Sequence, residues 1–397
     1  MSGVMHIEEP RQPLPPRGLA LWELGFRPFY LLASIFAALS IALWALQYAG
    51  WLPQPYLHGP LWHAHEMLFG FALAVIVGFL LTAGRNWSNQ PTPTGGRLAA
   101  LAALWLAARV LVLTPWGWAA AAANVAFPLA AAVALAIPFV RAGNRRNYFF
   151  VGLLGLLAVA AAWVHLSMLG VLHWPPMAGL QIALDVLLFI ISVMAGRVVP
   201  MFTNNGVPGA QATRRPWVEK AALGSVLALL AADALQLPGP VLALIATVGA
   251  AAHLARWLLW QPWTTLRTPL VWVLHAAYLW VPVHLALRAA AVAGWADASL
   301  ATHALTVGAV GGLIIGMMTR TARGHTARPL RADRADVAAY LLVLAAALLR
   351  VLLPLLVPSL HYEAVLGSAA LWSTGFGVYA WRYWPVLMRP RLDGRPG

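Results

Sequence analysis

The chain has 397 residues, of which 61% are hydrophobic and only 10% are charged, and its formal net charge is +14. Soluble domains carry about 25% charged residues, so this composition excludes an ordinary soluble protein and indicates an integral membrane protein. The arginines are spread over many short loops and form no separate basic domain, so membrane lipid, and no nucleic acid, is the expected counter-charge. The absence of cysteine from the sequence excludes disulfides, iron–sulfur clusters, thiolate-bound copper and covalently attached haem.

Apolar segments long enough to cross about 30 Å of hydrocarbon follow one another along the chain. They are rich in Leu and Ala and contain Gly and Pro, which is typical of helices rather than of barrel strands. The sequence therefore predicts an all-α integral membrane protein, a single bundle of about twelve transmembrane helices. In chain order the predicted segments are 28–50, 61–83, 97–113, 116–140, 148–170, 178–203, 217–236, 239–260, 268–292, 300–322, 335–357 and 364–386.

The loops between these segments alternate in charge, and this alternation predicts the topology. By the positive-inside rule both termini are cytoplasmic, which requires an even number of spans. We expect a proline-rich cytoplasmic tail at 1–24, one transmembrane domain at 25–388 and a second cytoplasmic tail at 389–397. The first tail has no apolar run, so no signal peptide is expected. The loops without Lys or Arg, assigned to the outer side, are 51–60, 171–177, 237–238, 293–299 and 358–363.

The stretch "LWHAHEMLFGF" at 61–71 places several polar side chains at the outer start of the second segment. Residues two apart on a helix point about 200° apart, so His63 and His65 cannot easily bind one face of one metal. They could serve two centres on opposite sides of the helix, or one could ligate while the other holds a supporting group. Glu66 must be paired, metal-bound or protonated at this depth. The alternative is simply a polar helix start at the membrane interface.

Other histidines lie within the apolar segments, and topology places them at different depths. His303 falls at the outer start of its segment, His165 and His284 lie in outer halves, and His275 lies about 10 Å deep from the inner side. A lone membrane histidine is more often a hydrogen-bonding group than a ligand. Several helices that supply imidazoles to one bundle favour haem iron or copper. We therefore expect His63 or His65 to bind a metal together with His275 or His303.

Buried charges offer a second candidate function. Asp185 lies in the outer half of the sixth segment, at a depth comparable to Glu66. Ion pairing is one interpretation of these carboxylates, and a proton path from the outer face is the other. Gly308, Gly312 and Gly316 recur every four residues, a stripe that lets helices pack closely. Close approach of a flat cofactor to this stripe is the alternative.

Polar residues also gather where the sixth and tenth segments end on the inner side. Arginine suits bidentate recognition of carboxylates, and haem carries two propionates. A cofactor-binding cluster is therefore predicted there, with inner positive charge and helix capping as the alternative. One haem cannot contact both this cluster and the outer histidines, which lie about a bilayer's width away. The members of the cluster are Arg197, Asn204, Arg320 and His325.

Several motifs in this order resemble the NnrS family, bacterial inner-membrane proteins that contain haem and copper and are associated with the nitric oxide response. The resemblance implies the motif histidines His63, His65, His275, His303 and His325 as functional residues. The chain departs from the family pattern at Arg85, where an apolar residue is expected, and at Ala327, where glycine is usual. The motifs are "FRPFYLLA" at 26–33, "WHAHEMLFGF" at 62–71, "GFLLTAGRNW" at 78–87, "GRVVPMFTNN" at 196–205, "LHAAYLW" at 274–280, "HALTVGAVGG" at 303–312 and "MTRTARGHTARPL" at 318–330.

The sequence leaves three possible functions open. The first is a nitric oxide reductase-like oxidoreductase that uses protons drawn through Glu66 or Asp185, with an electron donor that the sequence does not identify. The second is a haem-based nitric oxide sensor or a metal-handling protein without turnover. The third is a secondary transporter, although no half-sequence symmetry is evident. Any haem is expected to be b-type, because no cysteine is present to attach it.

Overall fold

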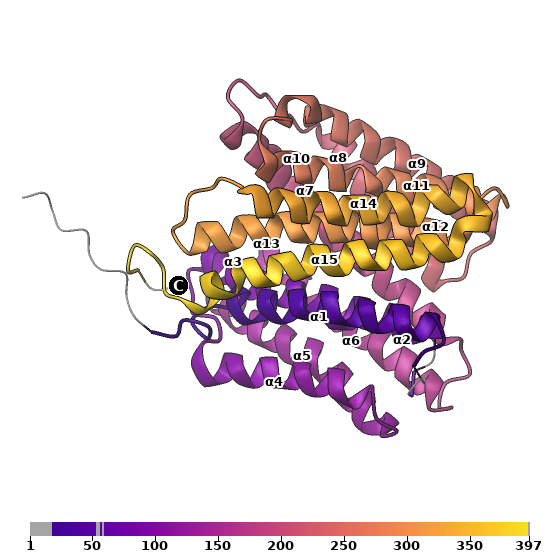
Figure 1. Ribbon diagram of the computed structural model, residues 1–397, viewed down its shortest axis with the longest axis horizontal. Coiled ribbons are helices and arrows are strands. Elements are labelled where there is room, and N and C mark those ends of the chain that lie inside the picture. The colour runs from indigo at the N-terminus through magenta and orange to yellow at the C-terminus, as the bar shows by residue number, and fades with distance from the viewer. Residues whose placement is uncertain (1–17, 53–55, 58, 396–397) are drawn as a thin grey trace, which may run out of the picture.

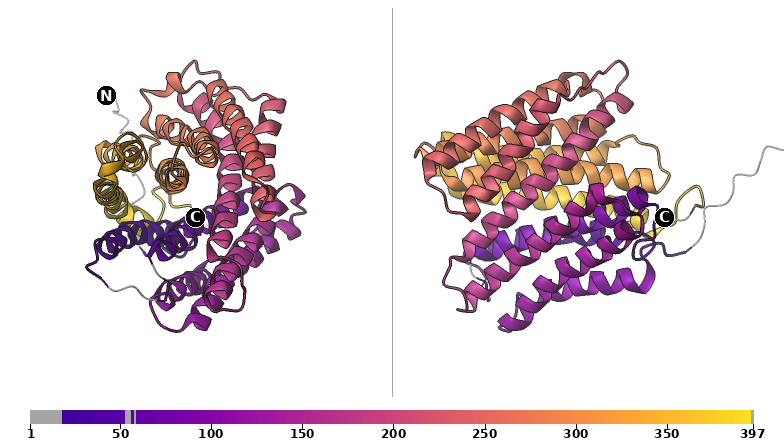
Figure 2. Two further views of the ribbon diagram at one scale, coloured as in Figure 1. Left: turned by 90° about the vertical axis from the view of Figure 1, so that its right-hand side faces the viewer. Right: turned by 180° about the vertical axis from the view of Figure 1, so that it is seen from behind.

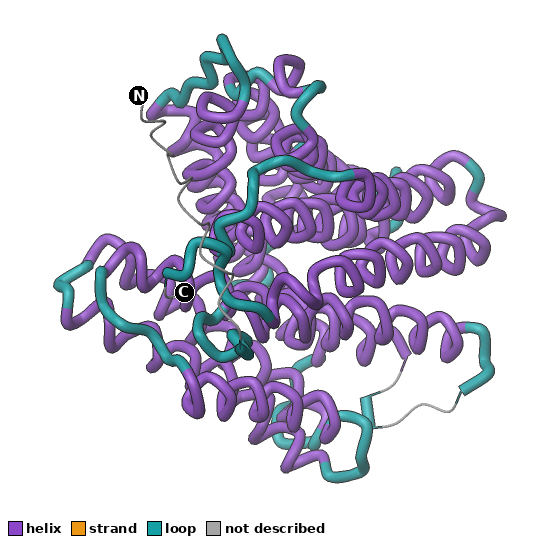
Figure 3. Tube along the Cα trace, turned by 60° about the vertical axis from the view of Figure 1, so that its left-hand side comes forward, coloured by secondary structure: helices purple, strands orange, loops and turns teal. Residues whose placement is uncertain are grey.

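The computed structural model describes residues 18–52, 56–57 and 59–395. Most of the predicted tail at 1–24 therefore lies outside the described residues, as does the end of the tail at 389–397. Within the described part, the regular structure is entirely helical, with no strand (Figure 3). The long helices run roughly along one common direction and are joined by short loops (Figure 1). The prediction of an all-α chain is thus confirmed.

Each of the predicted segments forms helix, and several extend beyond their predicted ends because polar residues continue the helical turn. Some helices are joined end to end through a 3-10 or π turn, and these carry separate labels. The elements are α1 (Phe26–Tyr48), α2 (Gly59–His65), η1 (Glu66–Ala72), α3 (Leu73–Ser88), α4 (Gly95–Leu111), α5 (Gly117–Arg141), η2 (Arg145–Asn147), α6 (Tyr148–Met168), α7 (Pro176–Gly206), α8 (Pro216–Ala234), α9 (Gly239–Leu259), η3 (Pro262–Thr265), α10 (Pro269–Tyr278), α11 (Trp280–Val292), α12 (Ala298–His303), η4 (Ala304–Gly311), α13 (Gly312–His325), α14 (Arg334–Leu356), η5 (Pro358–Leu360) and α15 (His361–Met388).

Fewer helices qualify as membrane crossings than the sequence predicts. Among the described residues, nine continuous helices are long and apolar enough to cross a membrane, judged by length and composition alone. The remaining three predicted crossings correspond to α4, α8 and α15, and α4 has only 17 residues. A multi-pass membrane protein is therefore supported, whereas the count of twelve and the cytoplasmic position of both termini stay predictions.

Two of the long helices change their winding in the same way. The helix at 59–88 and the helix at 298–325 each contain a π-helical stretch, η1 and η4, immediately after a histidine. His65 precedes η1, and His303 precedes η4. Both helices are among the most buried of the bundle, and π turns are frequently found at functional sites. Nothing in the sequence predicted these turns.

The two ends of the bundle differ in the residues that they carry. The labels α2, α11 and α12 lie at one end, and α3, α10, α13 and the C-terminus lie towards the other (Figure 1). We call the first the histidine end, because His63, His65 and His303 lie on α2 and α12. The second is called the C-terminal end, and Figure 2 shows the C-terminus beside the bundle there.

The glycine stripe on the tenth predicted segment packs against α10 and α11, which precede it in the chain. A Cβ atom added at Gly312 would lie 2.6 Å from Cβ of Ala277, and one added at Gly316 would lie 2.8 Å from Cγ1 of Val273. At Gly308 the added atom would meet the ring of Trp280. The stripe therefore lets η4 and α13 approach α10 and α11 closely, which confirms the helix-packing interpretation.

Replacing Gly312 with alanine is expected to lower the free energy of unfolding by about 1–3 kcal/mol, because the added methyl group overpacks this contact. The matched control is Gly155→Ala on α6, where nothing lies within 4 Å of the added atom. Thermal unfolding of the purified variants measures the difference. Equal melting temperatures for the two variants would contradict the close packing.

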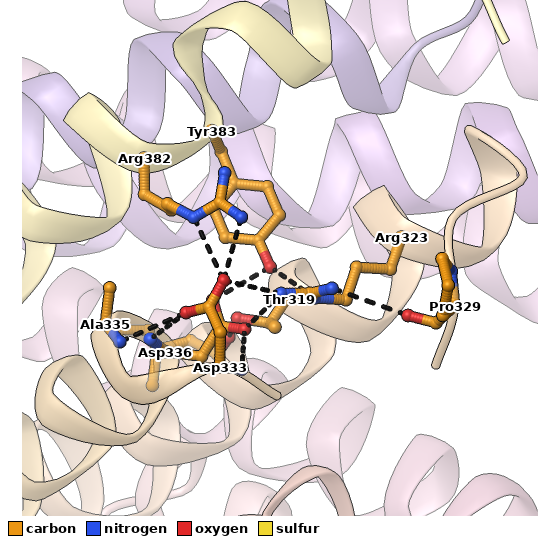
Figure 4. A network of polar contacts seen from close by, with 9 residues as sticks. Thr319, Arg323, Pro329, Asp333, Ala335, Asp336, Arg382 and Tyr383 are labelled. Carbon is orange, nitrogen blue, oxygen red and sulfur yellow. Dashed lines mark hydrogen bonds and ion pairs between the residues drawn. The ribbon is translucent and has the colours of Figure 1, made fainter. Parts of the chain in front are cut away.

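A network of polar side chains joins α13, α14 and α15 at the C-terminal end of the bundle (Figure 4). Nη2 of Arg323 donates to Oδ2 of Asp336 at 2.6 Å, and the hydroxyl of Tyr383 donates to Oδ1 of the same carboxylate at 2.9 Å. Asp333 caps α14 and accepts two hydrogen bonds from Arg382. Burial raises the pKa of the Asp333 carboxyl, but its hydrogen bonds with the Asp336 backbone and with Arg382 outweigh this and hold it below the ordinary value.

The end of α13 explains one departure from the family pattern. Ala327 has a φ of 57°, in the left-handed region, and follows the last turn of the helix. The amide of Arg328 donates to the carbonyl of Arg323 at 2.9 Å, which closes the helix end. A left-handed residue at this place is usually glycine, because glycine has no Cβ to strain the turn. The turn itself is therefore kept although the residue differs.

Candidate metal and cofactor site

The first candidate site is formed by His65 and His165, which face each other at the histidine end. Nδ1 of His65 lies 2.8 Å from Oε1 of Glu66, and both side chains are buried. A carboxylate accepts hydrogen bonds, so Nδ1 of His65 donates and Nε2 keeps its lone pair. That Nε2 lies 3.1 Å from Nε2 of His165, which comes from α6.

The separation of these two nitrogen atoms fits a shared metal ion. Two imidazoles that bind one ion at about 2.0–2.1 Å in tetrahedral geometry have nitrogens roughly 3.3 Å apart. The Glu66 carboxylate behind His65 is the supporting group that metal-binding histidines commonly have. Nδ1 of His165 is buried without a hydrogen-bond partner. Within the part of the chain that the structure describes, no cluster of three or more His, Asp or Glu forms a metal site, so this pair offers at most two protein ligands.

The second candidate site is formed by His63 and His303. Their rings lie nearly parallel, at 8°, with centroids 6.2 Å apart, and the ring of Trp44 lies against His63 at 5.0 Å. Nδ1 of His303 is 2.7 Å from the carbonyl oxygen of Ser299. Since a carbonyl can only accept, Nδ1 donates and Nε2 of His303 is left with its lone pair. His63 and His65 thus contact different neighbours, as their spacing along the helix predicted.

Arg350 adds a positive charge next to the second pair. Its Nη2 donates to Oγ of Ser299 at 2.9 Å, the residue whose carbonyl holds His303. Nη1 of Arg350 is buried without a hydrogen-bond partner. Among the described residues no carboxylate lies within 4 Å of this guanidinium. An anionic group of a bound molecule would be stabilised there.

The other buried histidines differ in whether a ring nitrogen is free. His253 is fully bonded, because Nε2 donates to the carbonyl of Ala222 at 3.1 Å and Nδ1 accepts from the hydroxyl of Tyr278 at 2.6 Å. His284 donates from Nδ1 to the carbonyl of Ala301 at 2.7 Å, and its Nε2 is buried without a partner. A free lone pair on His284, beside α12, is a feature that the sequence did not single out.

His275 lies apart from the histidine end. Its Nε2 is 2.8 Å from Oγ1 of Thr203, and its ring lies against Trp260. It lies on α10, in the half of the bundle towards the C-terminal end (Figure 1). Nδ1 of His275 is buried without a partner, so the side chain could still ligate, but the structure pairs His303 with His63 and not with His275.

The two predicted proton-path carboxylates belong to separate buried networks. Glu66 accepts a hydrogen bond from Nη1 of Arg109 at 2.5 Å. Asp185 accepts from Nη1 of Arg288 at 3.1 Å, and Arg288 also pairs with Asp233. Both carboxylates are therefore ion-paired, which is the first of the two interpretations, and Oδ2 of Asp185 is buried without a partner. A path that carries protons through them stays a prediction.

The predicted inner cluster is dispersed over different neighbours. Asn204 exchanges two hydrogen bonds with the backbone of Ala212, so it fixes the loop after α7. The guanidinium of Arg320 lies 3.8 Å from the centre of the Phe202 ring, and His325 packs against Phe26. Arg197 donates to Asn147 and lies over three aromatic rings. Among the described residues, no hydrogen bond, ion pair or ring contact joins any two members of this cluster.

Sequence reasoning missed two residues that the structure brings into the candidate site. His165 was placed in the outer half of its segment, but its partner His65 lies 100 residues earlier in the chain. Arg109 lies within an apolar segment and was given no role, and it is the ion-pair partner of Glu66. His65, Glu66, Arg109 and His165 are all predicted to lie at a similar depth below the outer surface. This shared depth is the one signal in the sequence that could have linked them.

Comparison with known proteins agrees with the motifs. The family model described as NnrS protein matches residues 20–391, nearly the whole chain. None of the curated proteins compared with the chain matches it. The match includes the buried histidine pairs and both helices with π-helical stretches. The chain therefore belongs to the NnrS family.

Proposed function

We propose that this protein binds haem b and copper in the bacterial inner membrane and handles nitric oxide there, in protection against nitrosative stress. Membership of the NnrS family and the set of apolar helices support this proposal. The observation that carries it is the opposition of two buried imidazole nitrogens, Nε2 of His65 and Nε2 of His165, 3.1 Å apart. Imidazole suits both copper and haem iron, and the chain has no cysteine to compete.

We assign the copper ion to His65 and His165, and the haem iron to the neighbouring pair His63 and His303. In this arrangement the Glu66 carboxylate orients His65, and the Ser299 carbonyl orients His303. Arg350 would pair with a propionate of a haem held at the second pair, in place of the inner cluster suggested by the sequence. A bound haem iron or copper ion supplies a centre that binds nitric oxide.

Metal content tests the assignment. His65→Ala and His165→Ala are expected to lose copper, and His63→Ala and His303→Ala to lose haem, whereas His253→Ala should keep both. Glu66→Gln should lower copper affinity by about 10–100-fold, because it replaces the carboxylate that supports His65 with a neutral amide. Elemental analysis and the absorption spectrum of purified protein measure both quantities. Full copper and haem content in all four ligand variants would overturn the assignment.

Turnover separates the reductase from the alternatives. A haem absorption band that shifts when nitric oxide is added would exclude a plain secondary transporter. Anaerobic formation of nitrous oxide from nitric oxide, with a supplied reductant, would then support an oxidoreductase. A shifted band without nitrous oxide would support a sensor or metal-handling protein instead. If turnover occurs, Asp185→Asn tests the proton path, and an unchanged rate would remove Asp185 from it.

A further inference from the structure

A basic pocket lies at the C-terminal end of the bundle, away from the histidine pairs. It has a volume of about 390 Å³, within the range of roughly 300–1,000 Å³ that is typical of small-molecule sites. It is formed where the end of α3, the loop before α6, the later part of α7 and the loop before α8 meet. Its lining residues are Trp87, Asn144, Arg146, Asn147, Arg197 and Arg214.

The charge of this pocket is unbalanced. Three of its six lining residues are arginines, and none is acidic. Within the described part of the chain, no carboxylate lies within 4 Å of any of these three guanidinium groups, none of which appears in an ion pair. Other arginines of the chain, such as Arg323 and Arg256, are paired with carboxylates. Three unpaired like charges around one cavity repel one another unless an anion lies between them.

Arg197 is held in place by the protein rather than by a counter-charge. Its guanidinium lies 5.5–5.8 Å from the centres of the Trp87, Phe149 and Phe150 rings, and Nη1 donates to Oδ1 of Asn147 at 3.0 Å. Asn147 in turn donates to Asn144, which donates to the carbonyl of Trp87. Both amides are thus used to fix the pocket wall, and the remaining N–H groups of Arg197 are available to a ligand.

Arg214 is tethered in a similar way, and Arg146 is not. Nη1 of Arg214 donates to the carbonyl of Gly196 at 3.2 Å, on the turn before Arg197. Arg146 is exposed on the loop before α6. Guanidinium groups bind the oxygen atoms of phosphate in pairs, and three of them around one cavity suit a group with several equivalent oxygens.

We propose that this pocket binds a phosphate group, carried either by a free phosphate anion or by the headgroup of an anionic phospholipid. The proposal is independent of the haem and copper assignment, because the pocket shares no residue with the histidine pairs. Positively charged loops at helix ends are where phospholipid headgroups meet a membrane protein, so the lipid source is physically reachable. The anion would neutralise Arg146, Arg197 and Arg214 together.

The test uses the purified full-length protein. Calorimetric titration with inorganic phosphate, against chloride of equal ionic strength, measures the free-anion arm. Retention of phosphatidylglycerol against phosphatidylcholine in nanodiscs, measured by mass spectrometry, gives the lipid arm. Arg146→Gln, Arg197→Gln and Arg214→Gln are each expected to weaken binding about tenfold. Arg145→Gln and Arg215→Gln are matched controls, since these neighbours do not line the pocket, and they should bind like the wild type.

Each outcome decides the proposal. Phosphate binding that weakens in the three pocket variants supports the free anion, and selective loss of phosphatidylglycerol in the same variants supports the lipid. Equal effects of pocket and control variants in both arms would overturn the site, as would the absence of binding in both. Arg146 and Arg214 are exposed, so their variants should fold even if Arg197→Gln does not. Loss of haem from Arg197→Gln with unchanged phosphate binding would also overturn it.

Discussion

Replacement of Arg109 by methionine is expected to lower the free energy of unfolding by about 3–5 kcal/mol, the usual cost of removing one partner from a buried ion pair. Glu66 is 1% exposed and Arg109 is 5% exposed, so the pair is buried away from bulk water. The substitution leaves the Glu66 carboxylate with His65 as its remaining partner. It also leaves Asn124 without the donor that Arg109 supplies.

The matched control is Arg97→Met on the same helix, α4. Arg97 is exposed in the first turn, so its loss should change the free energy of unfolding by no more than about 0.5 kcal/mol. Denaturant or thermal unfolding of detergent-purified protein measures both variants. Similar stability of Arg109→Met and Arg97→Met would show that the Glu66 pair contributes nothing.

A double variant separates the effect of the ion pair from the effect of losing the arginine side chain itself. Glu66→Gln combined with Arg109→Met removes both charges, so the double variant should be more stable than Arg109→Met alone. A double variant that is as unstable as the sum of the two single variants would mean that the charges are not coupled. The comparison also bears on the copper assignment, because Glu66 orients His65.

The sequence predicted the helical bundle well, because length and hydropathy are local properties of the chain. The helix at 59–88 is an example, because its apolar run is evident in the sequence. The predicted end at residue 83 was too early, since the helix continues through Arg85 to Ser88. The opposite directions of His63 and His65 also followed from the helical period alone. Both results depend only on residues that are close in sequence.

What the sequence could not predict are the partners that other helices supply. The pairing of His65 with His165, of Glu66 with Arg109 and of Asp185 with Arg288 depends on which helices are neighbours, and hydropathy does not encode this. The π-helical stretches after His65 and His303 depend on packing within the bundle in the same way. Arg197, Asn204, Arg320 and His325 share a predicted side of the membrane, yet each has different neighbours.

Replacement of Asp336 by alanine is expected to have a comparable effect on stability at the opposite end of the molecule, about 3–5 kcal/mol. Asp336 is 2% exposed and accepts from Arg323, from Tyr383 and from the backbone amide of Asp333 (Figure 4). Its loss leaves the Arg323 guanidinium with only Asp333, which is partly exposed, as a carboxylate partner. The ends of α13, α14 and α15 then lose the carboxylate that joins them.

The exposed pair of Arg391 and Asp393 provides the control for this prediction. The Nη2 to Oδ2 distance in that pair, 2.7 Å, is close to the 2.6 Å between Arg323 and Asp336, but both of its partners are close in sequence and reach solvent. Asp393→Ala should therefore lower the melting temperature far less than Asp336→Ala does, because an exposed ion pair contributes little. Thermal unfolding of Asp336→Ala and Asp393→Ala shows whether the loss of stability depends on burial, since the two ion pairs have similar distances. If both variants lose the same stability, burial adds nothing to the 2.6 Å contact of Asp336. The network of Figure 4 would then not hold the three helices together.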